Sequence, residues 1–241
     1  MNTTVYYLET HPTRPMIEWM QAALPLFPAT ECKRIVRYRY YKDQLLTFAG
    51  RLLLLKALKD LSLSSMLSLN DLKYTAFNRP FLDYPIDFNI THSGCYTMLA
   101  LTTTGAVGID IEKIAPIDME AVRDVFTNRE WEALMHKGYD EHFFYGLWTR
   151  KEAVVKIAGK GLYIAPGEVE VTGNPVQIGE HTCWLQPVEL DKQYIVHIAT
   201  TRALARDPTP LRIELETCIK ECLHPVQKLK CNHHENAHRH N

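Results

Sequence analysis

The sequence predicts an α+β fold, and three observations support this prediction. Segments with helical periodicity and segments rich in β-branched or alternating apolar residues occur in both halves of the chain. A helical segment precedes a group of strands twice, with a turn at Thr104-Gly105 between the groups. Hydrophobic residues make up 46% and charged residues 23% of the 241 positions, which is ordinary for globular proteins. We therefore expect two mixed halves, 1–104 and 105–225, followed by a polar tail over 226–241.

The first half is predicted to contain a strand, two helical stretches and two further extended segments. Several prolines limit the first helical stretch, whereas the second is long, basic at its start and apolar later. In chain order these elements are Val5–Glu9, Met16–Leu24, Glu31–Leu61, Phe88–Thr91 and Tyr96–Thr103.

The second half is predicted to open with a strand over Val107–Glu112, which could form a hairpin with the strand before it. Thr127 and Glu130 have the spacing of a capping box, which predicts a helix that runs to about residue 137. The strongest helical pattern is Glu141–Ala158, closed by Gly159. We expect strands at Val169–Thr172, His181–Leu185 and Tyr194–Thr200, and a further helix from Leu211.

Charge and composition exclude several classes of protein. The formal net charge of -1 gives no indication of a nucleic acid or an acidic membrane as partner. The N-terminus lacks a signal-peptide pattern, and the longest apolar run, the leucines at 52–55, is far shorter than the roughly 20 residues that span a bilayer. The six cysteines have no framework spacing. These features predict a soluble cytoplasmic protein with reduced thiols.

Three carboxylates and a lysine form the first candidate site. Asp110 and Glu112 alternate with isoleucines on a predicted strand, so they share one face, about 7 Å apart. Glu152 and Lys156 are i and i+4 on a predicted helix and also share a face. Together they could hold magnesium and neutralise phosphate oxygens. The alternative is an acidic strand face and an ordinary surface ion pair.

One further segment suits phosphate binding. Thr91 and His92 lie in a run of small, hydroxylated residues over 89–94, although a single histidine is more often structural. The basic run over 33–42 usually means a solvated helix face.

The order of these motifs resembles the signature of the 4'-phosphopantetheinyl transferases. The motifs are F-N-I-T-H-S-G at 88–94, G-I-D-I-E-K at 108–113 and W-T-R-K-E-A-V-V-K-I-A-G-K-G-L at 148–162. The resemblance covers roughly residues 31–162, and the chain length is similar to the longer, surfactin-synthetase-activating type. It implies a monomer of two similar halves related by pseudo-twofold symmetry, each a small sheet packed with a long helix.

The resemblance also implies an activity. The chain would transfer 4'-phosphopantetheine from coenzyme A to a serine of an apo acyl- or peptidyl-carrier protein, a transient partner, and release 3',5'-ADP. The first half would bind coenzyme A and the second would hold the metal and catalytic residues. Asp110, Glu112 and Glu152 would bind Mg2+. Glu112 or Glu152 would also deprotonate the serine, and Lys156 would contact the diphosphate and stabilise the leaving group.

The remaining implied residues contact coenzyme A. Thr91 and His92 match phosphate-contacting positions, and Lys151 belongs to the motif with a less defined role. The others are Arg79-Pro80 beside the nucleotide, with arginine in place of lysine, and Arg34 and Thr47 near the 3'-phosphate. Two departures concern the same pocket: 44–46 lacks the basic residues that the family often has there, and Asn78 replaces a common glycine.

Other interpretations remain open. The two strand carboxylates could serve a magnesium-dependent phosphohydrolase, or the chain could be a catalytically inactive protein that binds the coenzyme or the carrier. In the C-terminal region, cysteine and histidine side chains could bind zinc, although chance placement is the simpler explanation. They are Cys218, Cys222, His224, Cys231, His233 and His234.

Overall fold

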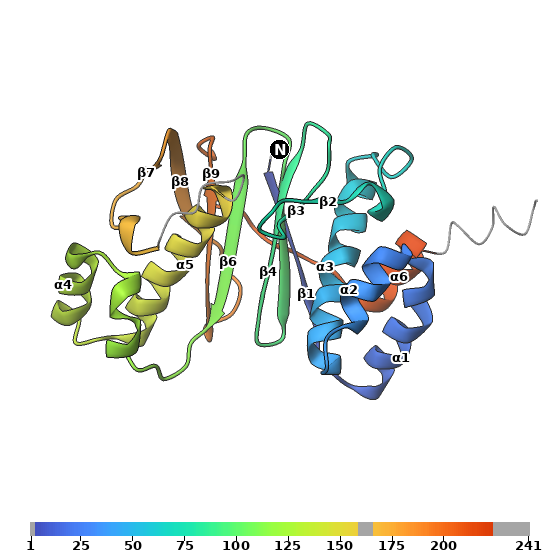
Figure 1. Cartoon of the computed structure of the whole chain (residues 1–241), viewed down its shortest axis with the longest axis horizontal. Coiled ribbons are helices and arrows are strands. Elements are labelled where there is room, and N and C mark those ends of the chain that lie inside the picture. Colours follow the sequence, from blue (N-terminus) through green and yellow to red (C-terminus); the bar gives the residue numbers. More distant parts are fainter. Residues whose placement is uncertain (1–2, 159–165, 224–241) are drawn as a thin grey trace, which may run out of the picture. The chain divides into compact units, whose positions relative to one another are not determined.

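The computed structural model describes residues 3–158 and 166–223, traced in Figure 1. The fold is α+β, as predicted. Contacts divide the chain into two compact units. We call residues 3–7 and 72–211 the sheet unit, and residues 8–71 and 212–223 the helical unit. The strands β1 (Thr3–Glu9) and β10 (Leu211–Arg212) cross from one unit to the other.

The helical unit is built from four α-helices and two short 3-10 turns. They are α1 (Arg14–Ala23), η1 (Leu24–Leu26), α2 (Ala29–Val36), α3 (Tyr41–Asp60), η2 (Leu69–Asp71) and α6 (Leu215–Leu223). The helical stretch predicted over 31–61 is interrupted, because Tyr40 adopts an extended backbone and starts a new helix. α3 forms the centre of this unit: Phe48, Leu52 and Leu58 are fully buried, and α3 contacts α1, α2 and α6.

The first sheet of the sheet unit contains β1, β5 (Tyr96–Thr102) and β4 (Asp87–Ser93), in that order. β4 and β5 form an antiparallel hairpin in which Ser93 pairs with Tyr96. The turn requires a glycine, because Gly94 has a φ of +59° and a Cβ there would lie 2.1 Å from the hydroxyl of Tyr194. A small hairpin of β2 (Lys73–Tyr74) and β3 (Pro80–Phe81) precedes it.

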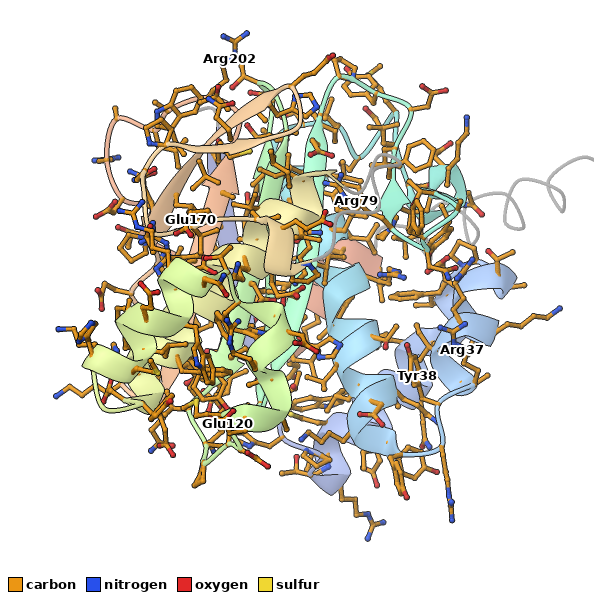
Figure 2. All side chains as sticks on the ribbon, turned by 60° about the vertical axis from the view of Figure 1, so that its left-hand side comes forward. Arg37, Tyr38, Arg79, Glu120, Glu170 and Arg202 are labelled. Atoms are coloured by element: carbon orange, nitrogen blue, oxygen red, sulfur yellow. The ribbon has the colours of Figure 1, made fainter. Side chains whose placement is uncertain are left out.

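The second sheet has the order β6 (Val107–Lys113), β9 (Tyr194–Thr200), β8 (His181–Pro187) and β7 (Val176–Ile178). The hairpin considered over 96–112 is wrong, because β5 pairs with β4 and β6 pairs with β9. The strand predicted over Val169–Thr172 is also wrong. Side chains hold that segment instead: Val171 N–H donates to Glu130 Oε1 at 2.9 Å, and the Thr127 hydroxyl donates to Glu170, labelled in Figure 2, at 2.6 Å.

The helices of the sheet unit are α4 (Asn128–His136) and α5 (Glu141–Ala158), with the 3-10 turns η3 (Glu120–Val125) and η4 (Pro166–Glu168). The predicted capping box is confirmed, since Thr127 and Glu130 bond to each other's backbone N–H groups. The predicted bounds of the α5 helix are also confirmed, whereas Gly159 lies outside the described residues. α5 lies across β6 and β9 (Figure 1).

The alternation of β6 divides its side chains between two environments, as predicted. Ile109 and Ile111 are fully buried in a core shared with β5 and β9. Gly108 belongs to the opposite set and faces α5, where a Cβ would lie 2.0 Å from the carbonyl oxygen of Ala153. α5 therefore packs directly on the strand that carries Asp110 and Glu112. Among the described helices, none is both long and apolar enough to span a bilayer.

Candidate functional site

The strands β4 and β6 belong to different sheets, and side chains of β4 join them. Side chains of alternate residues of β4 accept hydrogen bonds from backbone N–H groups of β6. These side chains take the place of the backbone carbonyl groups that a neighbouring strand would offer to β6. These bonds run from Val107 to Asp87 (2.9 Å), from Ile109 to Asn89 (3.0 Å) and from Lys113 to Ser93 (3.0 Å).

Asp110 lies at the centre of the site. It is 4% exposed, and its Oδ1 accepts hydrogen bonds from the Thr91 hydroxyl at 3.1 Å and from Lys156 Nζ at 2.6 Å. Its Oδ2 is buried and has no hydrogen-bond partner among the described residues. Burial raises the pKa of Asp110, and the charge of Lys156 opposes this shift.

Glu112 and Glu152 are both partly buried, and both lie close enough to Asp110 to be affected by its charge. Ser93 donates a hydrogen bond to Glu112 Oε2 at 2.9 Å. Burial and the charge of Asp110 raise the pKa of Glu112, and the same two causes, in the same order, raise the pKa of Glu152. The structure thus brings the three predicted carboxylates close enough to repel one another.

The donor set fits a hard divalent cation. With all three carboxylates ionised and Lys156 protonated, the cluster carries a net charge of about -2. No choice of one oxygen from each carboxylate brings all three within 4.8 Å of one another. The unpaired Oδ2 of Asp110 nevertheless offers an acceptor that no described group satisfies. Oxygen ligands of this kind are those that Mg2+ prefers.

Lys156 is held by three acceptors. Besides Asp110, its ammonium donates to Thr91 Oγ1 at 3.2 Å and to the carbonyl oxygen of Ile109 at 3.1 Å. Its side chain is 26% exposed, so the charge lies at the edge of the cluster and not in the core. His92 follows Thr91 on β4 and is exposed, with its side chain on the opposite face of the strand.

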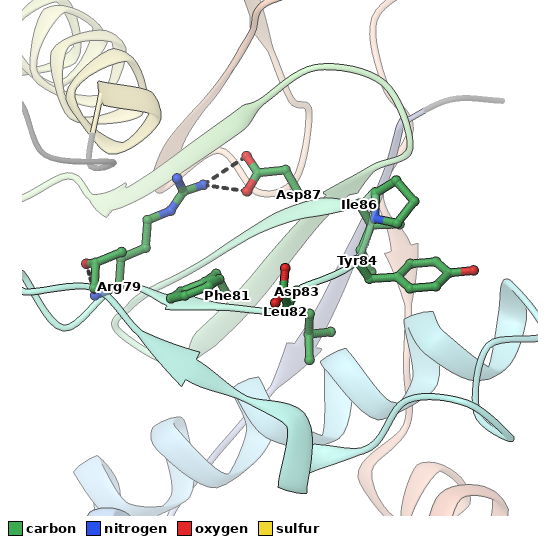
Figure 3. A pocket seen from close by; sticks show the side chains of 9 residues that line it. Arg79, Phe81, Leu82, Asp83, Tyr84, Ile86 and Asp87 are labelled. Carbon is green, nitrogen blue, oxygen red and sulfur yellow. Dashed lines mark hydrogen bonds and ion pairs between the residues drawn. The ribbon is translucent and has the colours of Figure 1, made fainter.

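Arg79 borders a cavity of about 570 Å3, lined by Thr75, Arg79 and residues 81–87 (Figure 3). Its Nη2 donates to both carboxylate oxygens of Asp87, at 3.1 and 3.0 Å, and to the carbonyl oxygen of Val107 at 3.1 Å. The guanidinium therefore connects the starts of β4 and β6. Asn78, where the family commonly has glycine, has a φ of 60°, a region that asparagine tolerates better than most residues. Pro80 begins β3.

The structure does not bring Lys151 to the carboxylate cluster. Its side chain is 1% exposed, and its ammonium forms a 2.6 Å ion pair with Glu130 Oε2. The same ammonium donates to the carbonyl oxygens of Pro166, at 2.9 Å, and of Val169. A lysine buried and bonded in this way holds α5 against α4 and the segment after η4, and it is not available to a coenzyme phosphate.

Arg34 and Thr47 belong to the helical unit, on α2 and α3. Thr47 donates to the carbonyl oxygen of Asp43 at 2.9 Å. Arg34 Nε lies 3.9 Å from Glu31, which also pairs with Arg51. The loop between the two helices adds Arg37 and Tyr38, labelled in Figure 2. A hydrogen bond from Arg37 lowers the pKa of Tyr38, and Tyr38 also interacts with Thr47 and Arg51, so two arginines lie near Thr47.

Two sets of residues that position the site were not predicted from the sequence: side chains of β4 that bond to β6, and a contact between α5 and β9. Asp87, Asn89 and Ser93 position β6, and their two-residue spacing on one strand face was the signal that could have found them. The Thr149 hydroxyl forms a 2.8 Å hydrogen bond with His197 Nδ1, and this bond joins α5 to β9. Burial lowers the pKa of His197 to about 4, so its ring is neutral. No sequence pattern indicated that contact, because it depends on tertiary packing.

Two family models match the chain side by side. A model described as the 4'-phosphopantetheinyl transferase superfamily matches residues 106–205, and one described as 4'-phosphopantetheinyl transferase, N-terminal, matches residues 12–104. The two matches together fit a fold of two halves. The domain bounds predicted from the sequence stay a prediction, and the polar tail over 226–241 lies outside the described residues.

Several curated proteins are similar to the chain. The 4'-phosphopantetheinyl transferase gsp of Aneurinibacillus migulanus is 34% identical over 145 residues, 59% of this chain and 60% of that protein. The 4'-phosphopantetheinyl transferase ffp of Bacillus subtilis is 30% identical over 204 residues, 78% of this chain and 89% of that protein. The L-aminoadipate-semialdehyde dehydrogenase-phosphopantetheinyl transferase of Xenopus laevis is 29% identical over 214 residues, 76% and 70% of the two chains.

The similarity to ffp extends over most of both proteins, and the two family models cover the strands and helices that build the carboxylate cluster. The chain therefore belongs to the 4'-phosphopantetheinyl transferase superfamily.

Proposed function

We propose that the chain transfers the 4'-phosphopantetheine group of coenzyme A to a serine of an acyl- or peptidyl-carrier protein and releases 3',5'-ADP. The observation that carries the proposal is the cluster of Asp110, Glu112, Glu152 and Lys156, assembled from β6 and α5 in a chain of this family. Phosphoryl-type transfer requires positioning and charge neutralisation more than covalent chemistry from the protein.

Asp110, Glu112 and Glu152 are the proposed Mg2+ ligands. Support comes from their mutual repulsion, from the unpaired Oδ2 of Asp110 and from the excess negative charge of the cluster. When bound, Mg2+ supplies positive charge to the diphosphate oxygens of the coenzyme.

The chain's own residues move the proton and neutralise the leaving group. The serine oxygen attacks the β-phosphate of coenzyme A, and the serine proton passes to a carboxylate oxygen of Glu112 or Glu152, directly or through water. Both glutamates have raised pKa values, which suits a proton acceptor. Lys156 neutralises the 3',5'-ADP that leaves, because its ammonium is at the edge of the cluster.

The residues that contact coenzyme A are also a proposal. Thr91 and His92 on β4 are the proposed phosphate contacts, and the cavity beside Arg79 is the proposed place for the nucleotide. Arg34 and Thr47 are the proposed contacts of the 3'-phosphate, supported by the basic surroundings of Thr47. Lys151 is left out of this set because its ammonium is buried and fully bonded.

The carrier protein is the proposed transient partner of a monomeric enzyme in the cytoplasm. The cytoplasmic location is supported by the cysteines of the described part of the chain, which are free thiols.

Intact-mass analysis of an apo carrier protein tests the reaction. After incubation with the enzyme, coenzyme A and Mg2+, the carrier should gain one phosphopantetheine, and a carrier with its serine replaced by alanine should gain nothing. The Asp110→Asn enzyme is the matched control, because it keeps the side-chain shape and loses the charge. Hydrolysis of a simple phosphate ester without a carrier would favour the phosphohydrolase instead. Tight coenzyme binding with no mass gain would favour an inactive binding protein.

A further inference from the structure

α6 carries two cysteine thiols that lie side by side. Cys218 and Cys222 are i and i+4 on the helix, and their Sγ atoms are 3.9 Å apart. Cys218 is buried against α3, with its Sγ 3.6 Å from the carbonyl oxygen of Leu52, whereas Cys222 is half-buried. Both are free thiols of the helical unit, and neither takes part in the proposed transfer.

Two lysines of α3 lie close to the turn of α6 that carries Cys222. Lys56 and Lys59 of α3 lie 3.9 and 3.7 Å from the carboxylate of Glu221, and Lys59 also donates to the Glu221 carbonyl oxygen at 3.1 Å. Partly exposed cysteines near lysines are the reactive ones, because the thiolate is the nucleophile. The hydrogen bond with Cys218 lowers the pKa of Cys222, and Lys59 and Lys56 add to this effect, whereas burial and the charge of Glu221 oppose it.

We propose that Cys222 and Cys218 form a thiol–disulfide exchange site for low-molecular-weight disulfides such as glutathione disulfide. The Cys222 thiolate attacks one sulfur of the incoming disulfide, forms a mixed disulfide and expels one thiolate. Cys218 then passes its proton to the expelled thiolate, attacks Cys222 Sγ and expels the second thiolate. Two protein thiols are oxidised to one disulfide, and the small disulfide is reduced to two thiols.

Helix geometry makes the resulting disulfide reversible. Residues i and i+4 have Cα atoms about 6.2 Å apart, within the range of disulfides. Their Cβ atoms, roughly 5–6 Å apart, are farther apart than disulfides normally allow. The sulfur atoms must also approach from 3.9 Å to about 2.05 Å. Cys222 lies in the last described turn of α6, so this turn must loosen, and strained disulfides are the labile ones.

Peptide mapping of the full chain tests the proposal. The protein is equilibrated in glutathione buffers of increasing oxidised fraction, quenched with acid and digested with trypsin. Cleavage after Lys220 separates residues 213–220 from 221–228, so a Cys218–Cys222 disulfide joins these two peptides. We expect the joined peptides to accumulate with oxidation and to disappear when reduced glutathione is added.

Variants separate the two steps. Cys218→Ser should retain glutathione on Cys222, and Cys222→Ser should form neither product, with circular dichroism confirming that both variants fold. Cys32→Ser, in the same unit, should behave as wild type. Iodoacetamide at neutral pH should modify Cys222 at least about tenfold faster than Cys32. Peptides that stay unjoined in fully oxidised glutathione, a Cys222–Cys231 disulfide in their place, or a Cys222 that reacts no faster than Cys32 would each overturn the proposal.

Discussion

Replacing Gly108 by alanine should push α5 away from β6. The added Cβ would lie 2.0 Å from the carbonyl oxygen of Ala153 and 3.2 Å from the backbone nitrogen of Ile157. Both contacts are with helix backbone, which cannot move aside as a flexible side chain can. Overpacking of cores costs about 1–3 kcal/mol and occasionally more. A 2.0 Å contact with backbone belongs at the upper end, so we expect a loss of about 3 kcal/mol.

The same displacement should reduce activity in the folded fraction. α5 carries Glu152 and Lys156, and relief of the clash requires α5 to shift by roughly 1 Å, a misplacement that can cost about 100-fold in rate. Urea denaturation measures the free energy of unfolding, and single-turnover loading of a carrier protein measures the rate. Both losses should appear together.

Two control variants isolate the cause. Gly146→Ala, on α5 itself, places a Cβ that meets nothing within 4 Å, and it should stabilise the helix by about 1 kcal/mol. Adding Ala153→Gly to Gly108→Ala should not restore stability, because the clash is with a carbonyl oxygen and not with the side chain. If Gly108→Ala left the free energy of unfolding within about 0.5 kcal/mol of wild type, or if Ala153→Gly rescued it, the close packing of β6 on α5 would be disproved.

Three further substitutions test the site. Asp110→Asn should abolish the rise in Tm with Mg2+, which for the wild type corresponds to about 2.7 kcal/mol at 100 times the Kd; an unchanged rise would contradict the metal assignment. Lys151→Met leaves the buried Glu130 carboxylate without a positive partner and should cost about 3–5 kcal/mol of the free energy of unfolding, with the KM for coenzyme A unchanged. A raised KM at wild-type stability would instead make Lys151 a coenzyme ligand. Ser93→Ala removes the hydrogen bond to Glu112 and the one from the Lys113 N–H, and should cost about 2 kcal/mol in stability. Its effect on loading should appear as a higher Mg2+ requirement, and an unchanged requirement would show that Ser93 does not position Glu112.

The sequence predicted the local elements of the site better than their connections. Alternation placed Asp110 and Glu112 on one face of β6, and helical periodicity gave the bounds of α5, because both patterns depend on near neighbours. Pairing of β6 with β9 could not be predicted in the same way, since 80 residues, 114–193, lie between the two strands and only the shared core selects the partner. The segment over 169–172 resembles a strand in composition, but Glu130 and Thr127 supply its hydrogen bonds.

The sequence motif did not separate the roles of Lys151 and Glu152. Lysine and glutamate at 151 and 152 are neighbours in sequence, but adjacent residues on a helix point about 100° apart. Glu152 therefore faces Asp110, whereas Lys151 enters the core and meets Glu130. A motif indicates that both positions matter, and only burial separates the residue that holds the helix from the residue that faces the substrate.

The spacing between the two strand motifs follows from the same geometry. The hydrogen bonds from β6 to β4 join residues that are always 20 positions apart: 107 to 87, 109 to 89 and 113 to 93. A constant difference means that the strands run parallel in one register, whereas antiparallel strands would give a constant sum. A shift by one residue would place Phe88 and Ile90 against the N–H groups of β6 and turn Thr91 away from Asp110. The motif over 88–94 and the carboxylate motif over 108–113 therefore have the separation that the hydrogen bonds between β4 and β6 require, and β5 with its two connections supplies that length.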